Sequence, residues 1–306
     1  MSPGLRRTLI DYAPLPDLRL ARDLVDILDG TTKAILAKKK EGLRLGDSVI
    51  KEQIGQGKDF TSLLMKAYDS EDGQMTEEEL LGQMNVILFA GVDTTSTTVA
   101  RCLQELSKNH DIQGRLRAEI DNASVDGDLD YETLCNLPLL DAVARETLRM
   151  YPAAITSSRE ALKDSVLPLS KPMTGVDGTP ITEVFVPKGT VVHIGVRAAN
   201  QDRTVWGEDA AEWKPERWLK PLPDEVVNSK IPGVHPKLMS FIGGPRGCIG
   251  YKFAEISMKV LLAVLIQNFE FSPSEAEIVW KLGQAEAPTV NGKQAMPIIV
   301  TARAPL

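Results

Sequence analysis

The most informative stretch of this sequence is Phe241-Ile-Gly-Gly-Pro-Arg-Gly-Cys-Ile-Gly250, where four glycines surround a single cysteine. Glycines keep side chains out of a short loop, so something large and flat can lie against its backbone. Cys248 stands where the loop is predicted to enter a helix that runs to about Gln267. The N–H groups of such a helix end and the nearby Arg246 would favour the thiolate form of the cysteine, which binds metal. Taken alone, the motif also fits a small buried cysteine in a glycine turn.

The composition of the 306-residue chain excludes several classes of protein. Its hydrophobic fraction of 43% and charged fraction of 25% are those of a globular protein. The net charge of −7 argues against nucleic acid as a partner, because a nucleic-acid binder needs a basic face. Three scattered cysteines make neither a disulfide framework nor a zinc site, and the glycine loop matches neither the dinucleotide-binding pattern nor the P-loop. The N-terminus has no apolar signal region, and the longest apolar runs, 86–92 and 260–266, are shorter than the roughly 18 residues of a membrane span.

The first half of the chain has the pattern of helices. A capping box at Thr76 and Glu79 begins a predicted helix of about 30 residues that contains no proline. An earlier helix, starting near residue 20, is predicted to end at the Lys38-Lys39-Lys40 triplet and Gly42. Two further helices are predicted at 112–121 and 138–150, the second with a proline in its first turn.

The second half of the chain, after Pro152, has a different pattern. Residues 184–186 and 191–194 are predicted to pair as a hairpin around Pro187-Lys-Gly189. Residues 205–240 contain five prolines, which predicts an irregular meander, and the tail after the last helix is predicted to form short strands. We therefore predict a mainly α fold with small β-sheets (α+β). It is predicted to be one domain over 1–306, helix-rich in 1–150 and mixed in 151–306, because no Pro- or Ser-rich linker divides the chain.

A carboxylate and a guanidinium share one face of the helix predicted at 138–150. Glu146 and Arg149 are three residues apart, which places their side chains side by side. Glu41 and Arg44 show the same spacing, so the pattern alone also fits a surface pair that contributes under about 1 kcal/mol. The helix around Glu146 is otherwise apolar, however, and a charge in an apolar setting needs a partner.

The long helix contains a segment of poor helix formers, Ala90-Gly-Val-Asp-Thr-Thr95. Glycine costs about 1 kcal/mol against alanine inside a helix, and Asp and Thr prefer caps and turns. The Thr94 hydroxyl, one turn after Ala90, would donate to the Ala90 carbonyl in place of a backbone N–H and open the helix locally. A tolerated polar face is the simpler interpretation.

Together, these motifs resemble the cytochrome P-450 family of haem-thiolate monooxygenases. The family pattern F-x-x-G-x-R-x-C-x-G is matched by Phe241, Gly244, Arg246, Cys248 and Gly250. A weaker likeness, to the fungal microsomal branch of the family, lies in Asn200-Gln-Asp202 and Trp206-Gly-Glu-Asp209. Three other motifs match the family and follow its order along the chain. These other matches are A-G-x-D-T at Ala90 to Thr94, E-x-x-R at Glu146 and Arg149, and P-E-R at Pro215-Glu-Arg217, with Trp218 where phenylalanine is commoner.

The resemblance implies a role for each matched residue. Cys248 would be the axial thiolate ligand of haem b, and the metal would be its iron. Arg246 and Arg159 would pair with the haem propionates, while Asp93 and Thr94 would deliver protons during oxygen activation. The remaining assignments are Phe241, Gly244, Gly250, Ala90 and Gly91 as haem contacts, and Glu146, Arg149 and Arg217 as a buried charge triad.

The resemblance also implies the reaction and its partners. A monooxygenase of this family inserts one atom of O₂ into an organic substrate, here a small apolar one, with electrons from an NADPH-dependent flavoprotein reductase. The microsomal likeness suggests the endoplasmic reticulum membrane, although no anchor is present in the chain. The candidate substrate-lining positions by analogy are Asn85, Val86, Phe89, residues 153–156, Thr289 and Val290, whereas His110, His193 and His235 are expected to be surface or packing residues.

The match begins near the family's F–G region, so the chain is expected to be an N-terminally truncated member of the fold. Two other functions therefore stay open. One is a peroxygenase, isomerase or dehydratase on the same fold, against which the intact Asp93–Thr94 pair argues. The other is a non-catalytic remnant that binds haem poorly or not at all.

Overall fold

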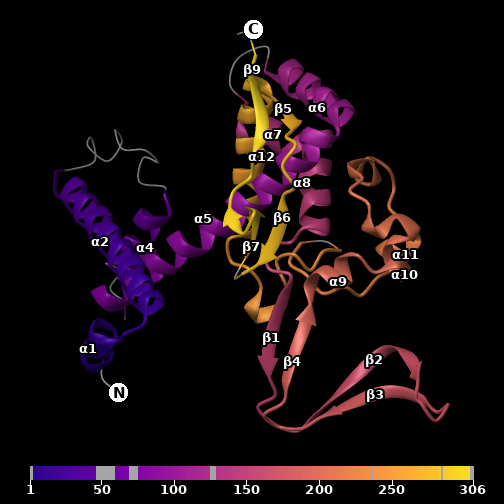
Figure 1. Ribbon diagram of the computed structural model, residues 1–306, viewed down its shortest axis with the longest axis horizontal. Coiled ribbons are helices and arrows are strands. Elements are labelled where there is room, and N and C mark those ends of the chain that lie inside the picture. Colours follow the sequence, from indigo (N-terminus) through magenta and orange to yellow (C-terminus); the bar gives the residue numbers. More distant parts are fainter. Residues whose placement is uncertain are drawn as a thin grey trace. The chain divides into compact units, whose positions relative to one another are not determined.

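The computed structural model describes residues 3–45, 59–68, 75–124, 129–235, 237–283 and 285–303 (Figure 1). These residues group into two compact units, Met1–Val92 and Asp93–Leu306. Helix α5 (Glu77–Lys108) contributes to both units. The single domain over 1–306 stays a prediction.

The first unit consists of α1 (Pro3–Tyr12), α2 (Pro16–Leu45), α4 (Phe60–Tyr68) and the first part of α5. Pro14 and Pro16 separate α1 from α2, because a proline has no N–H to continue a helix. Arg7 of α1 donates to the Asp26 carboxylate of α2 at 2.7 Å and joins the two helices. The unit has a small core of its own, formed by Leu36, Met65, Leu80 and Met84.

The predicted end of α2 was wrong. The helix continues through Gly42 to Leu45, and Gly42 is buried inside it. Two lysines of the triplet have ion-pair partners: Lys39 with Asp59 at 2.6 Å and Lys40 with Glu77 at 2.7 Å. These contacts and the burial outweigh the roughly 1 kcal/mol that a glycine costs inside a helix.

Helix α5 begins as predicted. The Thr76 N–H donates to the Glu79 carboxylate at 2.7 Å, and the Glu79 N–H donates to Thr76 Oγ1 at 3.2 Å. Among the described residues, α5 is also the helix that is long and apolar enough to cross a membrane, with a mean hydropathy of 1.2 over a stretch that is 28% buried. The uninterrupted apolar runs of this helix are shorter than a membrane span, because Gly91, Asp93 and the threonines interrupt them, whereas its mean hydropathy stays high. A core helix meets the same length and composition, so the finding assigns no location.

The second unit is built on α5 and three further long helices. These are α6 (His110–Ala123), α8 (Pro138–Met150) and α12 (Tyr251–Asn268), with the short α7 (Tyr131–Asn136) between α6 and α8. Figure 1 shows α6, α7, α8 and α12 grouped together, with the yellow C-terminal strands beside them. The helices predicted at 112–121 and 138–150 are confirmed.

The core of this unit lies between the same helices. α12 packs on α6 and α8, and α8 also packs on the meander. Helix α8 buries ten of its thirteen residues, which explains how one helix can hold a charge cluster away from water. The largest fully buried apolar side chains of the core are Leu106, Leu116, Ile120, Leu140, Trp206, Leu238, Met258, Leu262 and Ile266.

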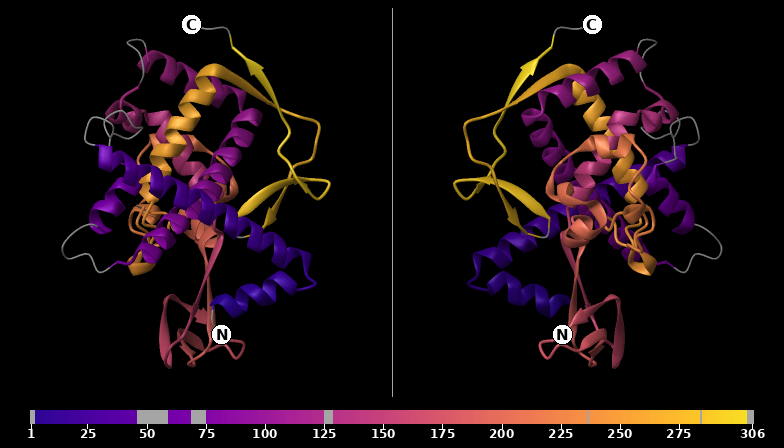
Figure 2. Two further views of the ribbon diagram at one scale, coloured as in Figure 1. Left: turned by 90° about the vertical axis from the view of Figure 1, so that its left-hand side faces the viewer. Right: turned by 90° about the vertical axis from the view of Figure 1, so that its right-hand side faces the viewer.

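Small antiparallel sheets follow α8. β1 (Thr156–Glu160) pairs with β4 (Val191–Gly195), and β2 (Ser165–Thr174) pairs with β3 (Pro180–Val186). In the tail, β5 (Phe269–Pro273) pairs with β9 (Ile298–Ala302), and β6 (Val279–Leu282), β7 (Glu286–Val290) and β8 (Lys293–Gln294) form one sheet in that order. The mainly α fold with small β-sheets is therefore confirmed. In both views of Figure 2 the β2–β3 hairpin extends away from the helices of its unit.

The hairpin predicted between 184–186 and 191–194 was wrong. The first segment belongs to β3 and pairs with β2, whereas the second is β4 and pairs with β1. Pro187 has no N–H for a ladder, and the turn that follows is closed on Ala161, which donates to Thr190 O at 2.9 Å and accepts from Gly189 N at 2.7 Å. The chain thus changes sheets at this turn.

The predicted meander consists of short helical turns that begin at Val196, before its predicted start at residue 205, and Pro215, Pro221 and Pro223 border the later turns. The turns are α9 (Val196–Asn200), α10 (Arg203–Trp206), η1 (Glu208–Ala211), η2 (Pro215–Leu219) and α11 (Asp224–Val227). A last turn, η3 (Gly244–Arg246), lies inside the cysteine loop.

Candidate cofactor site

The cysteine loop is closed by its own backbone. The Cys248 N–H donates to Phe241 O at 2.8 Å, and the Gly247 N–H donates to Gly244 O at 2.9 Å. Helix α12 begins only at Tyr251, so the prediction that Cys248 enters a helix was wrong by three residues. The first hydrogen bond of the helix runs from the Ala254 N–H to Gly250 O at 2.9 Å, so the helix starts after the loop has closed. Cys248 therefore lies at the end of a tight loop, with its side chain exposed.

The loop glycines have two different environments. A Cβ on Gly247 would lie 2.8 Å from Val234 Cγ1, and one on Gly243 would lie 3.1 Å from the Gly233 nitrogen. Gly244 has a φ of +69°, in the left-handed region that favours glycine, yet a Cβ on Gly244 or Gly250 would meet nothing within 4 Å. The loop is thus packed against 233–234 on one side and open at Gly244 and Gly250. An open backbone beside an exposed thiol fits a flat cofactor with a thiolate-bound metal.

This contrast predicts opposite results for two alanine substitutions. Gly247→Ala is expected to lower the free energy of unfolding by about 1–3 kcal/mol, because the new methyl group overlaps Val234. Gly250→Ala is expected to leave it unchanged or to raise it by less than about 1 kcal/mol, because its φ of −94° suits alanine. Urea unfolding of the cofactor-free chain measures both. Equal losses from the two substitutions would contradict the packing described above.

The three cysteines differ in their surroundings. Cys102 is fully buried in α5, and burial raises the pKa of its thiol to about 12. Cys135 is half-buried in α7, and Cys248 is exposed. A thiolate ligand must be ionised and reachable, so Cys248 meets the second requirement and Cys102 meets neither.

The two arginines assigned to haem propionates are both exposed but are not brought together by any described contact. Arg246 lies in η3, and within the described residues no ion pair holds its guanidinium. Arg159 lies on β1, where its Nη1 donates to Ser157 Oγ and to Ser158 O, each at 2.8 Å. Their role toward a propionate stays a prediction.

The Glu146–Arg149 pair is fully buried, with both side chains 0% exposed. Arg149 donates to both carboxylate oxygens, through Nε at 2.9 Å and Nη2 at 2.8 Å. The remaining donors of Arg149 bind backbone carbonyls of the meander: Asn200 at 2.9 Å, Ala210 at 2.6 Å and Glu212 at 2.9 Å. The Glu41–Arg44 pair, with the same spacing, has side chains 51% and 75% exposed. Identical spacing therefore gives a buried pair in α8 and a surface pair in α2.

Arg217 joins the pair and completes a cluster of three charges. Its Nε donates to Glu146 at 3.2 Å, and its Nη1 donates to Asp209 at 3.0 Å. Burial lowers the pKa of Arg217, but the charges of Glu146 and Asp209 outweigh the burial and raise it overall. Hydrogen bonds from Lys214 and then Arg217 lower the pKa of Asp209. We call Glu146, Arg149 and Arg217 the charge cluster.

Several partners of the charge cluster were not predicted. Trp218 Nε1 donates to Glu146 at 2.9 Å, as does the Lys214 N–H. Asn200 accepts from the Met239 N–H at 2.9 Å and donates to Ser240 Oγ at 2.9 Å, directly before the cysteine loop. In the sequence, the signal for these contacts was Trp218, which follows the P-E-R motif at a position where phenylalanine is commoner. These bonds connect α8 to the residues that lead into the loop.

The segment of poor helix formers in α5 does not open the helix. α5 is continuous through 90–95, so the predicted local opening was wrong. The Ser96 hydroxyl donates to Asp93 O at 3.1 Å and the Thr98 hydroxyl to Thr94 O at 2.9 Å, so hydroxyls here bond within the helix without breaking it. Residues 90–94 are all exposed. Asp93 and Thr94 are therefore accessible to a reacting group.

The other candidate positions have mixed outcomes. Val86 and Phe89 are more than half exposed, but Asn85 binds the Thr32 hydroxyl. Thr289 is buried, and its hydroxyl donates to Val279 O at 2.8 Å, so its side chain links β7 to β6. The histidines lie as expected: His235 is buried beside Glu255 at 2.9 Å, His193 binds Ser158 at 2.8 Å, and His110 begins α6.

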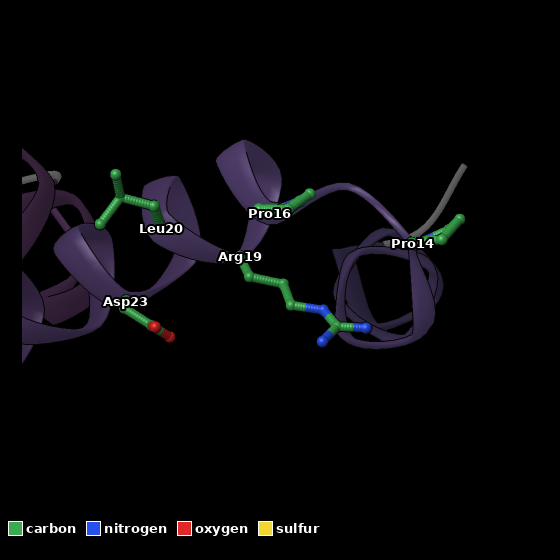
Figure 3. A pocket seen from close by; sticks show the side chains of 5 residues that line it. All are labelled: Pro14, Pro16, Arg19, Leu20 and Asp23. Carbon is green, nitrogen blue, oxygen red and sulfur yellow. The ribbon is translucent and has the colours of Figure 1, made fainter.

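A pocket of about 350 Å³ lies in the first unit, at the junction of α1 and α2. Pro14, Pro16, Arg19, Leu20 and Asp23 line it, and Figure 3 shows Arg19 and Asp23 on one side of the helix with Leu20 on the other. None of the predicted site residues is among these, so the pocket has no part in the candidate site.

The sequence matches the family model for cytochrome P-450 over residues 2–289. It is 48% identical to cytochrome P-450 monooxygenase 91 of Postia placenta over 302 residues, which are 97% of this chain and 56% of the relative. It is 48% identical to monooxygenase 212 of the same fungus, over 94% of this chain and 53% of that protein. A ganoderic acid synthetase of Ganoderma lucidum is 42% identical over 96% of this chain and 55% of its own length. The chain thus spans about half the length of the curated relatives it matches.

A family match over nearly the whole chain agrees with the cysteine loop, the charge cluster and the α5 segment described above. The chain belongs to the cytochrome P-450 family.

Proposed function

We propose that this chain forms the cofactor-binding part of a haem-thiolate monooxygenase. The reaction is R–H + O₂ + 2 e⁻ + 2 H⁺ → R–OH + H₂O, with electrons from an NADPH-dependent flavoprotein reductase. The observation that carries the proposal is the exposed Cys248 at the end of a closed loop whose backbone is open at Gly244 and Gly250. The relatives named monooxygenases support the reaction class.

The cysteine loop would hold haem b through the Cys248 sulfur. Bound haem supplies the oxygen-activating chemistry, which thiolate ligation favours. Arg246 and Arg159 carry exposed guanidinium groups that suit carboxylates, the groups that a haem propionate offers. The charge cluster acts at a distance, because its bonds to the meander hold the backbone from which the loop begins.

The chain's own acid–base groups would move protons. The Thr94 hydroxyl would donate a proton and the Asp93 carboxylate would take protons up from water, since both side chains are exposed on α5. The substrate is proposed to be a small apolar organic molecule, because Val86 and Phe89 expose apolar surface on α5.

A reduced carbon-monoxide difference spectrum tests the proposal. A thiolate-type band with added haem supports haem-thiolate binding, and its absence would favour a non-catalytic remnant. Turnover with a flavoprotein reductase then separates the activities. Product formed with NADPH and O₂ supports the monooxygenase, whereas product formed with peroxide alone, or without any oxidant, would identify a peroxygenase or an isomerase instead.

Thr94→Ala is expected to keep haem and substrate binding but to waste reducing equivalents. The hydroxyl would position a proton, so without it peroxide is expected in place of product, and the fraction of NADPH that yields product falls by about tenfold or more. The measurement compares NADPH consumed, peroxide released and product formed. Thr97→Ala is the matched control, because Thr97 is three residues further along α5 and is buried. Unchanged coupling in Thr94→Ala would contradict proton delivery through this hydroxyl.

A further inference from the structure

A second charge cluster, centred on a buried carboxylate, lies in the same unit, and the proposed reaction makes no use of it. Arg197, one of its two guanidinium partners, is 38% exposed. Glu286, the first residue of β7, is 6% exposed. Its two carboxylate oxygens accept from Arg101 of α5 at 2.9 Å and from Arg197 of α9 at 2.8 Å. One carboxylate thus joins a long helix, a short helix and a strand that lie far apart in the sequence.

Two aromatic rings fix the Arg101 guanidinium in place. Its Cζ lies 3.6 Å from the centre of the Trp280 ring and 4.4 Å from that of Tyr151. Both rings are held in turn by α5, because Trp280 Nε1 donates to Gln104 at 2.7 Å and the Tyr151 hydroxyl donates to Glu105 at 3.1 Å. Burial lowers the pKa of Arg101, and the hydrogen bond that Arg101 donates to Glu286 opposes that shift. Because Arg101 is confined in this way, a shift of the Glu286 carboxylate would also shift α5 at Arg101.

Arg101 lies on the same face of α5 as Thr94. Seven residues turn an α-helix by about 700°, only about 20° short of two full turns, and advance it by about 10.5 Å. Thr94 and its neighbour Asp93 are exposed, whereas the Arg101 side chain is 11% exposed. Holding Arg101 therefore fixes the rotation of α5 about its own axis, and with it the direction in which Thr94 projects.

We propose that Glu286 is a positioning residue that sets the rotation of α5 and so aims the Thr94 hydroxyl. The inference rests on the proposed function for what Thr94 does, but the contacts that set the rotation exist without the cofactor. Glu286 also touches α9, whose Arg197 N–H donates to Ile155 O at 3.2 Å in the segment predicted to line the substrate. The same carboxylate thus links the proton-delivery helix to that segment.

Hydrogen exchange of the cofactor-free chain tests the positioning directly. In Glu286→Gln the amides of 93–104 are expected to exchange about tenfold faster or more, because a bond to a charged group is lost at each arginine. Asp121→Asn is the matched control, since Asp121 pairs with Arg303 at 3.3 Å in a partly buried bridge that does not involve α5. Its effect on 93–104 is expected to be absent.

Arg101→Lys covers the case in which Glu286→Gln does not fold. It keeps the charge beside Glu286 but loses the planar group between the two rings, so 93–104 should again exchange faster while the chain stays folded. In the haem-loaded protein with reductase, each variant that folds should raise the peroxide fraction severalfold with an unchanged substrate-binding spectrum.

The two proposals fail separately. Exchange in 93–104 that matches the unsubstituted chain in the folded variants would overturn the role of Glu286 and leave the proposed function standing. Faster exchange in 93–104 with an unchanged yield of product per NADPH would also overturn the role of Glu286, because the rotation of α5 would then not direct the Thr94 hydroxyl. If the unsubstituted chain shows no thiolate band, the proposed function fails, and an unchanged exchange rate in 93–104 would still refute the positioning.

Discussion

Arg149→Ala is expected to abolish the folded protein. The substitution removes the guanidinium and leaves the Glu146 carboxylate 0% exposed, with its charge no longer matched within α8. Among the described residues, Arg217 is then the one guanidinium left beside Glu146. Removing one partner from a buried ion pair costs about 3–5 kcal/mol, a large part of the about 5–15 kcal/mol that holds a domain folded. It also frees three carbonyls of the meander, at Asn200, Ala210 and Glu212. Soluble yield and thermal unfolding followed by circular dichroism measure the loss.

Arg44→Ala is the matched control for this prediction. Arg44 holds Glu41 at 2.9 Å with the same spacing, but the pair is exposed and contributes under about 1 kcal/mol. Its unfolding transition should therefore coincide with that of the unsubstituted chain. If both variants give the same yield and the same transition, burial does not distinguish the two pairs and the role given to the charge cluster is wrong.

Cys248→Ser is expected to remove the thiolate-type band from the carbon-monoxide spectrum completely. A serine hydroxyl is not ionised near neutral pH and gives no sulfur bond to iron, so any haem that remains is bound through another group. The loop should stay folded, because the Cys248 contact described here is made by its backbone N–H. The measurement is the difference spectrum of the haem-loaded protein, with haem content determined separately.

Cys135→Ser serves as the control, since Cys135 is half-buried in α7. Its spectrum should match that of the unsubstituted chain. A full thiolate band in Cys248→Ser would show that the ligand is Cys102 or Cys135. A lost band in Cys135→Ser would also contradict the assignment of the ligand to Cys248.

Local signals in the sequence predicted the longer helices, α2, α5, α6, α8 and α12, but not the shorter ones. The capping box at Thr76 and the proline at Pro138 act within one turn, so they define where α5 and α8 begin. The end of α2 and the pairing of β3 were missed because distant contacts decide them. Lys39 and Lys40 meet partners 20 and 37 residues away, and β3 finds β2 and not the nearer β4.

In the candidate site, too, residues in short local patterns were predicted and residues fixed by distant contacts were missed. The motifs named Cys248, Glu146 and Arg149 because each lies in a short pattern. No local pattern marks Glu286, whose arginines are 89 and 185 residues away. The absence of an opening in α5 was also not predictable, since the bonds from Ser96 and Thr98 depend on rotamers that a sequence does not specify.

The charge cluster has a consequence for how the chain is made. Within the described residues five donors converge on Glu146, and three of them come from Lys214, Arg217 and Trp218, which follow it by 68, 71 and 72 residues. At a synthesis rate of about 5–20 residues per second, these partners leave the ribosome about 3–14 seconds after Glu146. During that interval the apolar face of α8 has no meander to cover it. The nascent chain therefore passes through a stage in which this helix must be shielded by a chaperone or stay beside the ribosome until its partners arrive.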